Sequence, residues 1–335
     1  MRVGFNPNKN KTIDETTYFH HIIIPVYIPH FKDYFKESFD ILKLSLESLF
    51  LTCHHQTYFT IINNGSCHEV VKYLDNLFRE KKIHTLTHTD NIGKMNAISK
   101  GLVGHDFDFV TITDADVLFL NNWQEETYLV FEKFPQTGTV SPTPSPKLYA
   151  YLTEKIIRTY LFSNKLRFTK VKDVAALKSF ALSIGNKDFY NSTHLDKILS
   201  ISNKDYSAVV GAGHFVATYR SEIFKNENLK VTTHKMGEAL AEFLDYRTVK
   251  KGLWRLSTEK NYAYHMGNIV EPWMRDKISK LTHNTTNPNI SLAKIELNNS
   301  YVFRDRLFRY FFKFKPIRKW FLNHKGLTKQ EAHNY

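Results

Sequence analysis

The chain has 335 residues, 42% of them hydrophobic, which is enough for one large α/β domain or for a domain with appendages. Its formal net charge of +13 favours polyanionic partners such as nucleic acid, anionic lipid or phosphorylated ligands. The sequence has no run of about 18 apolar residues, so we expect no membrane-spanning helix, and residues 1–19 lack the apolar core of a signal peptide. The two cysteines, Cys53 and Cys67, form no C-x-x-C pair, which predicts reduced thiols, no zinc cluster and a cytosolic setting.

Strand and helix patterns alternate along the first third of the chain. The apolar run at 21–28 predicts a buried strand, and apolar residues at helical spacing between 39 and 50 predict a helix after it. Further strands are expected at 58–62, 83–87 and 107–113, with helices at 70–78 and 94–102 between them. This alternation is typical of a doubly wound, mostly parallel, Rossmann-like sheet. Ligands of such sheets bind beyond the carboxyl ends of the strands.

Pro142, Pro144 and Pro146 mark a break after this alternating part. Residues 147–205 have a mostly helical pattern and predict a helical insertion. Residues 208–219 then predict a strand, and residues 235–251 predict a helix that Gly252 closes. The sequence therefore predicts an α/β fold with a helical insertion in its second half.

Two carboxylates, Asp114 and Asp116, follow the expected strand at 107–113. In an extended turn, the first can hold a ribose or a bound water while the second meets a metal ion. Mg²⁺ and Mn²⁺ prefer oxygen ligands, bridge a carboxylate to a diphosphate and neutralise the charge of that diphosphate. The alternative is a solvated acidic turn, because D-x-D by itself is a common sequence.

Polar residues also follow the first two strands. Pro25 and Tyr27 end the first strand and can frame a nucleotide base, with Tyr27 stacking on it, whereas the isoleucines before them belong to the core. Asn63 and Asn64 end the second strand, where amides can hydrogen-bond a base or a ribose. An N-G turn is nevertheless more often only a turn.

A third polar turn, Asn91-Ile92-Gly93-Lys94, precedes the helix expected at 94–102. Gly93 lets the backbone approach a ligand closely, and Lys94 at the start of the helix can meet a phosphate. The alternative is a helix-capping turn with a solvated lysine.

In their order and spacing, these segments resemble the motifs of glycosyltransferase family 2, which has the GT-A fold. That family carries P-x-Y on its first strand, D-[DN]-G-S after the second, then N-x-G-x-x-x-A, then D-A-D. The matching segments, within residues 21–120, are Pro25-Val26-Tyr27, Asn63-Asn64-Gly65-Ser66, Asn91-Ile92-Gly93-Lys94-Met95-Asn96-Ala97 and Asp114-Ala115-Asp116. Asn63 stands where the family usually has Asp, so the identity of the base stays open.

The resemblance implies a glycosyltransferase of the hexosyltransferase type (EC 2.4), metal-dependent and inverting, in surface polysaccharide or glycoconjugate synthesis. It implies a UDP- or GDP-sugar donor, a glycan or lipid-linked acceptor, and Mn²⁺ or Mg²⁺ held by Asp114 and Asp116. Residues 18–120 would form the nucleotide-sugar-binding half, and residues 121–300 the acceptor-binding half, of one GT-A domain at 1–300. The implied donor-binding residues are Pro25, Tyr27, Asn63, Asn64, Asn91, Gly93, Lys94 and Asp114.

Two segments of the second half resemble the family more weakly. Gly213 and His214 lie in Gly211-Ala212-Gly213-His214-Phe215, which looks like the glycine-rich acceptor segment of the family. His265 is similar to the late histidine that GT-A enzymes place on the metal or the diphosphate. The alternative for His265 is a structural role, which is more usual for a lone histidine.

The catalytic base is expected near residue 240. The family frame E-D-x-x-L-x-x-R-x-x-x-x-G matches Leu244, Arg247 and Gly252, but its acidic pair falls on Leu240-Ala241. Three nearby acids are candidates for taking the proton of the acceptor hydroxyl: Glu238, Glu242 and Asp245. We expect Glu238 to be the base, since the helix start lies nearer the ligand edge of the sheet, and at least one of the three to be solvated.

Residues 302–322 interleave aromatic side chains with basic ones: Arg304, Arg306, Arg309, Lys313, Lys315, Arg318 and Lys319. The basic amphipathic tail at 301–335 therefore resembles an interfacial helix pair, broken near Pro316, that lies on an anionic leaflet. This predicts a cytoplasmic protein held peripherally on the inner face of the cell membrane. The alternative is a C-terminal helix that packs its aromatics on the core and leaves its basic face solvated.

Three other classes of protein compete with this interpretation. A sugar-phosphate nucleotidyltransferase shares a similar nucleotide-binding half, but it needs a G-x-G-T-R-like loop after its first strand, which residues 25–27 do not provide. A nucleic-acid-binding protein is favoured by charge alone, since no zinc-finger spacing, RNP-like motif or basic-region heptads occur, so we expect no nucleic acid. A catalytically inactive glycosyltransferase-like partner protein stays open because the acidic pair is displaced.

Overall fold

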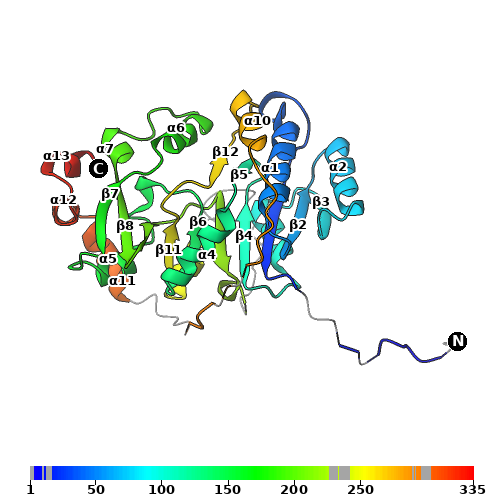
Figure 1. Cartoon of the computed structure of the whole chain (residues 1–335), viewed down its shortest axis with the longest axis horizontal. Coiled ribbons are helices and arrows are strands. Elements are labelled where there is room, and N and C mark those ends of the chain that lie inside the picture. The colour runs from blue at the N-terminus through cyan, green and yellow to red at the C-terminus, as the bar shows by residue number, and fades with distance from the viewer. Residues whose placement is uncertain are drawn as a thin grey trace.

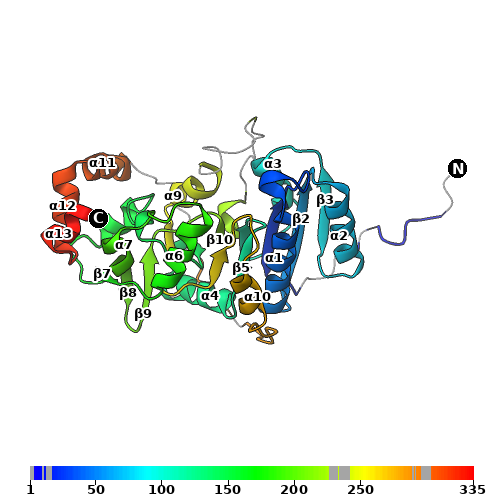
Figure 2. The same ribbon diagram turned by 90° about the horizontal axis from the view of Figure 1, so that it is seen from above.

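A computed structural model of the chain describes residues 4–9, 11–12, 17–225, 233, 242–288, 290, 292–295 and 303–335. A ten-stranded sheet forms its centre, and helices lie on both faces of that sheet (Figures 1 and 2). The α/β class expected from the sequence is confirmed.

The first half alternates strands and helices as predicted. Its elements are β1 (His20–Val26), η1 (Asp33–Phe35), α1 (Ser38–Thr52), β2 (Thr57–Asn64), α2 (His68–Arg79), β3 (Thr85–Thr89), α3 (Lys94–Leu102), β4 (Phe109–Thr113), β5 (Val117–Phe119), α4 (Trp123–Lys133) and β6 (Thr137–Ser141).

The second half is mixed. Its elements are η2 (Pro146–Leu148), α5 (Glu154–Thr159), β7 (Leu166–Lys170), α6 (Val174–Ser183), α7 (Ser192–Asp196), β8 (Lys197–Asn203), β9 (Tyr206–Val210), β10 (Val216–Arg220), η3 (Ser221–Ile223), η4 (Glu242–Tyr246), α9 (Arg247–Lys250), β11 (Trp254–Ser257), β12 (Ala263–His265), α10 (Pro272–Ile278), α11 (Phe303–Phe312), α12 (Lys315–His324) and α13 (Lys329–Asn334).

The strand order of the large sheet is β3-β2-β1-β4-β10-β6-β11-β9-β8-β7. The pairings make β1 to β4, β6, β8 and β11 run in one direction, and β7, β9 and β10 in the other. The first four strands thus form the parallel half that the alternating pattern predicts. Their carboxyl ends lie at one edge of the sheet, which is where ligands of parallel sheets bind.

Both faces of β1 are buried, which explains its unbroken apolar run. Ile22 and Ile24 pack in a cluster with residues of α1 and α2, whereas Ile23 points to the opposite face and packs against α3. Side chains of a strand alternate between the two faces, so helices on both sides require apolar residues at every position. Each of these three isoleucines is 0% exposed.

The expectation of a helical insertion at 147–205 needs correction. This segment contains α5, α6 and α7, but it also contributes β7 and β8, which extend one end of the large sheet. The strand expected at 208–219 is two strands, β9 and β10, separated at Gly211, whose φ is +102°. Short strands in a half-polar segment carry little periodicity, so their pairing with distant strands decides their structure.

A second, two-stranded sheet joins β5 to β12, and the sequence did not predict it. Its register pairs His265 with Val117, and the amide of Met266 donates to the carbonyl of Asp116 at 2.8 Å. The late segment of the chain is therefore held against the D-x-D turn by backbone hydrogen bonds.

The C-terminal helices α11, α12 and α13 pack at the end of the sheet formed by β7 and β8 (Figures 1 and 2). Phe312, Phe321 and Leu322 belong to the core cluster of that end. In the part of the chain that the structure describes, no helix has the length and apolar content to cross a membrane. Cys53 and Cys67 are free thiols.

Candidate functional site

A pocket of about 500 Å³ opens at the carboxyl ends of β1, β2 and β4, and we call it the strand-end pocket. Seven of the residues proposed from the sequence line it: Pro25, Tyr27, Asn64, Asn91, Lys94, Asp114 and Asp116. They come from four separate segments, so the parallel sheet brings the motifs together as predicted. The same pocket is also lined by residues that sequence reasoning missed: Tyr34, Phe35, Ser38, Ile41, Gly267 and Asn268.

Lys94 and Asp114 form an ion pair inside this pocket. Their side chains are 20% and 25% exposed, so the pair is shielded but still open to a ligand. Lys94 is the first residue of α3, and Gly93 before it has φ +86°, a conformation that favours glycine. The start of α3 thus places an ammonium group and the positive end of a helix dipole at the pocket, an arrangement suited to an anion.

Asp116 lies beside His265. The Nε2 atom of His265 is 3.5 Å from Oδ2 of Asp116, and its Nδ1 atom is 3.0 Å from the hydroxyl of Ser183. Burial raises the pKa of the Asp116 carboxyl, His265 and Lys94 counteract this rise, and the negative charge of Asp114 adds to it. The other oxygen, Oδ1, is buried and has no hydrogen-bond partner in the described residues.

A buried carboxylate oxygen without a partner is costly unless a ligand satisfies it. A divalent cation fits this need, because Mg²⁺ and Mn²⁺ take carboxylate oxygens and complete their shells with water and phosphate oxygens. Within the described residues, no group of three His, Cys, Asp or Glu side chains is arranged to hold a metal by itself. The arrangement therefore suits a cation shared between the protein and a phosphorylated ligand, rather than one fully caged by the chain.

Asn64 and Asn91 join two turns at the rim of the pocket. Oδ1 of Asn64 accepts a hydrogen bond from the amide of Ile92 at 2.9 Å, and its Nδ2 donates to Oδ1 of Asn91 at 3.4 Å. Gly65, with φ +89°, makes this approach possible, since a Cβ there would lie 2.8 Å from the amide nitrogen of Asn91. The N-G turn thus fixes the geometry of the pocket.

Asn63 does not line the pocket, although the sequence places it in the donor site. It is 2% exposed, its Nδ2 is 2.8 Å from Nδ1 of His88, and its Oδ1 accepts from the amide of Ser66 at 3.1 Å. His88 in turn lies 3.0 Å from Asp75. The side chain of Asn63 is therefore held away from the pocket by its hydrogen bonds to His88 and Ser66, which the motif alone does not reveal.

Of the residues that sequence reasoning missed, Ser38 and Ile41 belong to α1, and the others come from the connections that follow β1 and β12. Tyr34 and Phe35 belong to η1, after the first strand, and Phe35 packs edge-on against Tyr27 at a ring distance of 5.8 Å. Asn268 follows β12, and its Nδ2 donates to the carbonyl of Tyr34 at 3.0 Å. The two loops thus close one side of the pocket. The only sequence signal for them is the aromatic content of residues 31–35.

Of the three candidate bases, the structure describes the side chain of Asp245 alone. Glu238 lies outside the described residues, and Glu242 is described only as the first residue of η4. Asp245 is 0% exposed, and its Oδ1 accepts from Nη2 of Arg255 at 2.7 Å. Its Oδ2 is 3.1 Å from Nδ1 of His214. A carboxylate so enclosed has no path to an acceptor hydroxyl, so Asp245 does not have the exposure that a direct base requires.

His214 is, by contrast, 42% exposed. It precedes Phe215, whose carbonyl accepts from the amide of Asp114 at 2.8 Å, and β10 continues that antiparallel pairing with β4. His214 therefore lies at the same edge of the sheet as the D-x-D turn, opposite Ala115. Because Asp245 accepts from Nδ1, Nε2 of the imidazole carries the lone pair of a proton acceptor, and no hydrogen bond to it occurs among the described residues.

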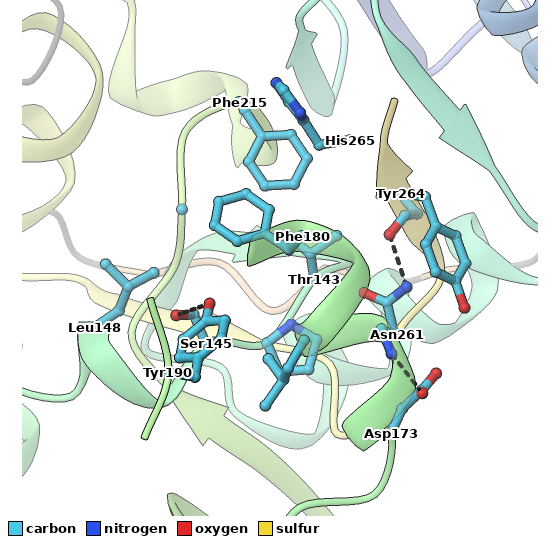
Figure 3. Close-up of a pocket in the computed structure, with 15 residues that line it drawn as sticks. Thr143, Ser145, Leu148, Asp173, Phe180, Tyr190, Phe215, Asn261, Tyr264 and His265 are labelled. Atoms are coloured by element: carbon cyan, nitrogen blue, oxygen red, sulfur yellow. Dashed lines mark hydrogen bonds between the residues drawn. The ribbon is translucent and has the colours of Figure 1, made fainter. Parts of the chain in front are cut away.

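A smaller cavity of about 40 Å³ lies beside the strand-end pocket, and Gly213 and His265 are in its wall (Figure 3). Figure 3 shows the rings of Phe180 and Phe215 next to each other. The two rings are stacked, with their centroids 5.5 Å apart. The hydroxyl of Tyr190 is 2.9 Å from that of Ser145. His265 thus separates an aromatic cavity on one side from Asp116 on the other.

No protein-family model and no curated protein sequence matches the chain. Among solved structures, TarS 1-349 of S. aureus is similar at 10% identity and a TM-score of 0.44, over 74% of this chain and 60% of that one. TarS of S. aureus is similar at 10% identity and a TM-score of 0.43, over 78% and 38% respectively. TarS 1-349 in complex with UDP-GlcNAc matches at 10% identity and a TM-score of 0.44, over 94% and 69%. The chain thus spans 60% of the length of the first structure and 38% of the second.

Proposed function

We propose that the chain is a glycosyltransferase that binds a UDP- or GDP-sugar in the strand-end pocket and transfers the sugar to an acceptor. One observation carries the proposal: a lysine at a helix start, two carboxylates and two amides, from three separate motifs, line one pocket beyond the carboxyl ends of parallel strands. These groups match the parts of a nucleotide-sugar: base and ribose, diphosphate, and a cation bound to it. The order of the motifs, which resembles that of glycosyltransferase family 2, supports the same function.

A divalent cation, Mn²⁺ or Mg²⁺, would be held by Asp116 and approached by Asp114 and His265. When bound, it supplies charge neutralisation for the departing nucleoside diphosphate. Lys94 meets the same diphosphate as a second cation. The unpartnered Oδ1 atom of Asp116 supports this assignment, because a cation satisfies an oxygen that has no hydrogen bond from the described residues.

The general base must lie at the edge of the sheet where the pocket opens, because it takes the proton of the acceptor hydroxyl. His214 and Asp245 form a pair in which a buried carboxylate orients an exposed imidazole. Arg255 holds the carboxylate of Asp245 in place, because its guanidinium group donates hydrogen bonds both to Asp245 and to the carbonyl of Ala212. We assign the general base to Nε2 of His214 and a positioning role to Asp245. Glu238, the base expected from the sequence, stays a prediction.

The step that these groups support is a single displacement. Nε2 of His214 takes the proton of an acceptor hydroxyl, and that oxygen forms a bond to the anomeric carbon of the donor sugar. The bond from this carbon to the diphosphate oxygen breaks on the opposite face, and the nucleoside diphosphate leaves with the electron pair. Attack from the opposite face inverts the anomeric configuration, as the resemblance implies.

We propose that the aromatic cavity beside His265 helps to bind the acceptor. Phe180, Tyr190 and Phe215 offer apolar ring surface next to the hydroxyl of Ser145. Sugar rings bind through this combination of stacking and hydrogen bonding. We therefore propose a glycan acceptor, free or lipid-linked, of which one ring is held near this cavity and its hydroxyl near His214. A role in surface polysaccharide or glycoconjugate synthesis follows from such an acceptor.

A panel of UDP- and GDP-sugars tests the proposal, with release of the nucleoside diphosphate as the readout and Mn²⁺ or Mg²⁺ present. We expect release from one donor, including slow release to water when no acceptor is added. Binding of that donor without any release, in the presence of glycan acceptors, would support the inactive partner protein instead. Release of pyrophosphate from a nucleoside triphosphate and a sugar phosphate would support a nucleotidyltransferase.

A further inference from the structure

The C-terminal helices have two faces of different character. On the inner face, Phe321 and Leu322 are 1% and 0% exposed, in one core cluster with strands β8, β9 and β11. Asp305 accepts from Nε of Arg158 at 3.1 Å, and Nζ of Lys325 donates to the carbonyl of Tyr160 at 2.8 Å. The expectation that this segment packs its aromatics on the core is therefore correct for one face. The tail is an integral part of the fold.

The outer face exposes six large hydrophobic side chains. Their exposed fractions are 44% for Leu307, 64% for Tyr310, 48% for Phe311, 57% for Phe314, 40% for Ile317 and 49% for Trp320. Phe162, which is 79% exposed, joins them from the connection between α5 and β7, with its ring 6.4 Å from that of Trp320. These seven residues are close to half of the sixteen large hydrophobic side chains that are exposed in the described residues. Gathered at one end of the molecule, they form a patch that needs a partner.

Basic side chains interleave with this patch: Arg306, Lys313, Lys315, Arg318 and Lys319 are all exposed. Among the described residues, none of the five forms an ion pair with a carboxylate. The one acid of α11 and α12, Asp305, is 3% exposed and paired with Arg158. The outer face therefore presents apolar rings and positive charge, with no accessible negative charge from these two helices.

We propose that this outer face of α11 and α12, together with Phe162, docks the protein on an anionic lipid bilayer. Aromatic and aliphatic side chains enter the boundary between headgroups and acyl chains, while lysine and arginine stems reach the lipid phosphates. The charge of the face selects an anionic surface. Leu307 and Ile317 favour a bilayer over nucleic acid, because aliphatic side chains gain little from base stacking. The proposal does not depend on the proposed enzymatic activity.

Deletion of the tail cannot test this proposal, because it would also remove Phe321 and Leu322 from the core. Two double variants address the outer face: Phe314→Ser with Trp320→Ser, and Lys313→Glu with Lys315→Glu. A matched control is Phe78→Ser with Lys81→Glu. Phe78 is 47% exposed on α2, which lies at the opposite end of the sheet (Figure 1). Equal melting temperatures of the variants and the wild type verify that the fold is kept.

The measurement is co-sedimentation of the full chain with vesicles of phosphatidylcholine and phosphatidylserine mixed seven to three, and with vesicles of phosphatidylcholine alone. We expect binding to the anionic vesicles, roughly a tenfold loss in the aromatic variant, and a larger loss in the charge variant, on the order of fivefold for each charge removed. Salt should weaken binding of the aromatic variant and of the wild type alike. The control should bind as the wild type does. Equal binding of all variants would overturn the proposal, as would binding of RNA or self-association through this face without binding of vesicles.

Discussion

The ammonium group of Lys94 and the carboxylate of Asp114 form an ion pair that joins the first residue of α3 to the turn after β4. The two residues are twenty positions apart in the sequence and belong to different motifs. Both line the strand-end pocket, so a bound diphosphate would compete with Asp114 for the lysine. Asp114 therefore keeps the ammonium group of Lys94 at the position where we expect the diphosphate of the donor to bind.

Replacement of Lys94 tests this relationship. Lys94→Met should weaken binding of the nucleoside diphosphate roughly tenfold to a hundredfold, because hydrogen bonds to charged groups contribute about 1.5–3 kcal/mol. Lys94→Arg should keep most of the affinity. Lys100→Met, in the last turn of the same helix, is the control and should bind as the wild type does. Calorimetric titration with UDP and GDP is the measurement, and an unchanged affinity in Lys94→Met would remove the lysine from the site.

The pair of His214 and Asp245 makes a prediction about turnover. His214→Ala should lower kcat by about 10²–10⁴-fold while donor binding stays unchanged, since a general base acts in the transition state. Added imidazole should restore part of this loss, which a purely structural histidine would not show. His55→Ala, which changes an exposed histidine away from the pocket, is the control.

Two outcomes would contradict that assignment. If Glu238→Gln abolishes turnover and His214→Ala does not, the base expected from the sequence is correct. If Asp245→Asn lowers kcat without any change in His214→Ala, the carboxylate acts by itself. Because Asp245 is buried beside Arg255, its variant also loses stability, so kcat is compared only at temperatures where the melting curve shows a folded protein.

Buried histidines predict acid sensitivity of the fold. Burial, with a smaller contribution from neighbouring histidines, lowers the pKa of His20 well below 6.5, that of His21 to about 3 and that of His54 to about 4. Between these values and 6.5 the unfolded chain binds more protons than the folded chain. The contribution of these neutral histidines to the free energy of unfolding is therefore fully present above pH 6.5 and is lost as the pH falls through this window.

At pH 5, His21 and His54 should each lower the free energy of unfolding by about 2 kcal/mol, because one pKa unit corresponds to about 1.4 kcal/mol. Urea denaturation at pH 7.5, 6 and 5 is the measurement. His21→Asn should be less stable at pH 7.5, where it loses the hydrogen bond of His21 to Thr60, but should show a shallower pH dependence. His55→Gln should keep the slope of the wild type. Equal stability at pH 5 and 7.5 would show that these histidines are not buried as described.

The parts of the fold that local patterns determine could be predicted. The expected helix at 94–102 coincides with α3, and each strand expected before Asp114 overlaps an observed one. Asp114, Asp116 and Lys94 meet because parallel strands bring their carboxyl ends to one edge, a rule that needs no distant contact.

The parts of the fold that depend on contacts between residues far apart in the sequence could not be predicted. β12 pairs with β5 although the two strands lie in different halves of the chain, and only that pairing brings His265 to Asp116. Asn63 turns away from the pocket because His88, on another strand, holds its side chain. Asp245 becomes buried because Arg255, on β11, neutralises it. Motif spacing within one segment carries no information about such partners.

Joint binding of a nucleotide and a metal ion is the sharpest test of the proposed donor site. The measurement is calorimetric titration of the full chain, and of Asp116→Asn, with UDP and with GDP, in the presence and absence of Mn²⁺. We predict that one nucleotide binds the wild type, that Mn²⁺ tightens this binding at least tenfold, and that Asp116→Asn keeps its fold but loses the metal enhancement. Failure of both nucleotides to bind in the presence of Mn²⁺ would rule out the proposed donor site, and equal enhancement by Mn²⁺ in Asp116→Asn would rule out Asp116 as the metal ligand.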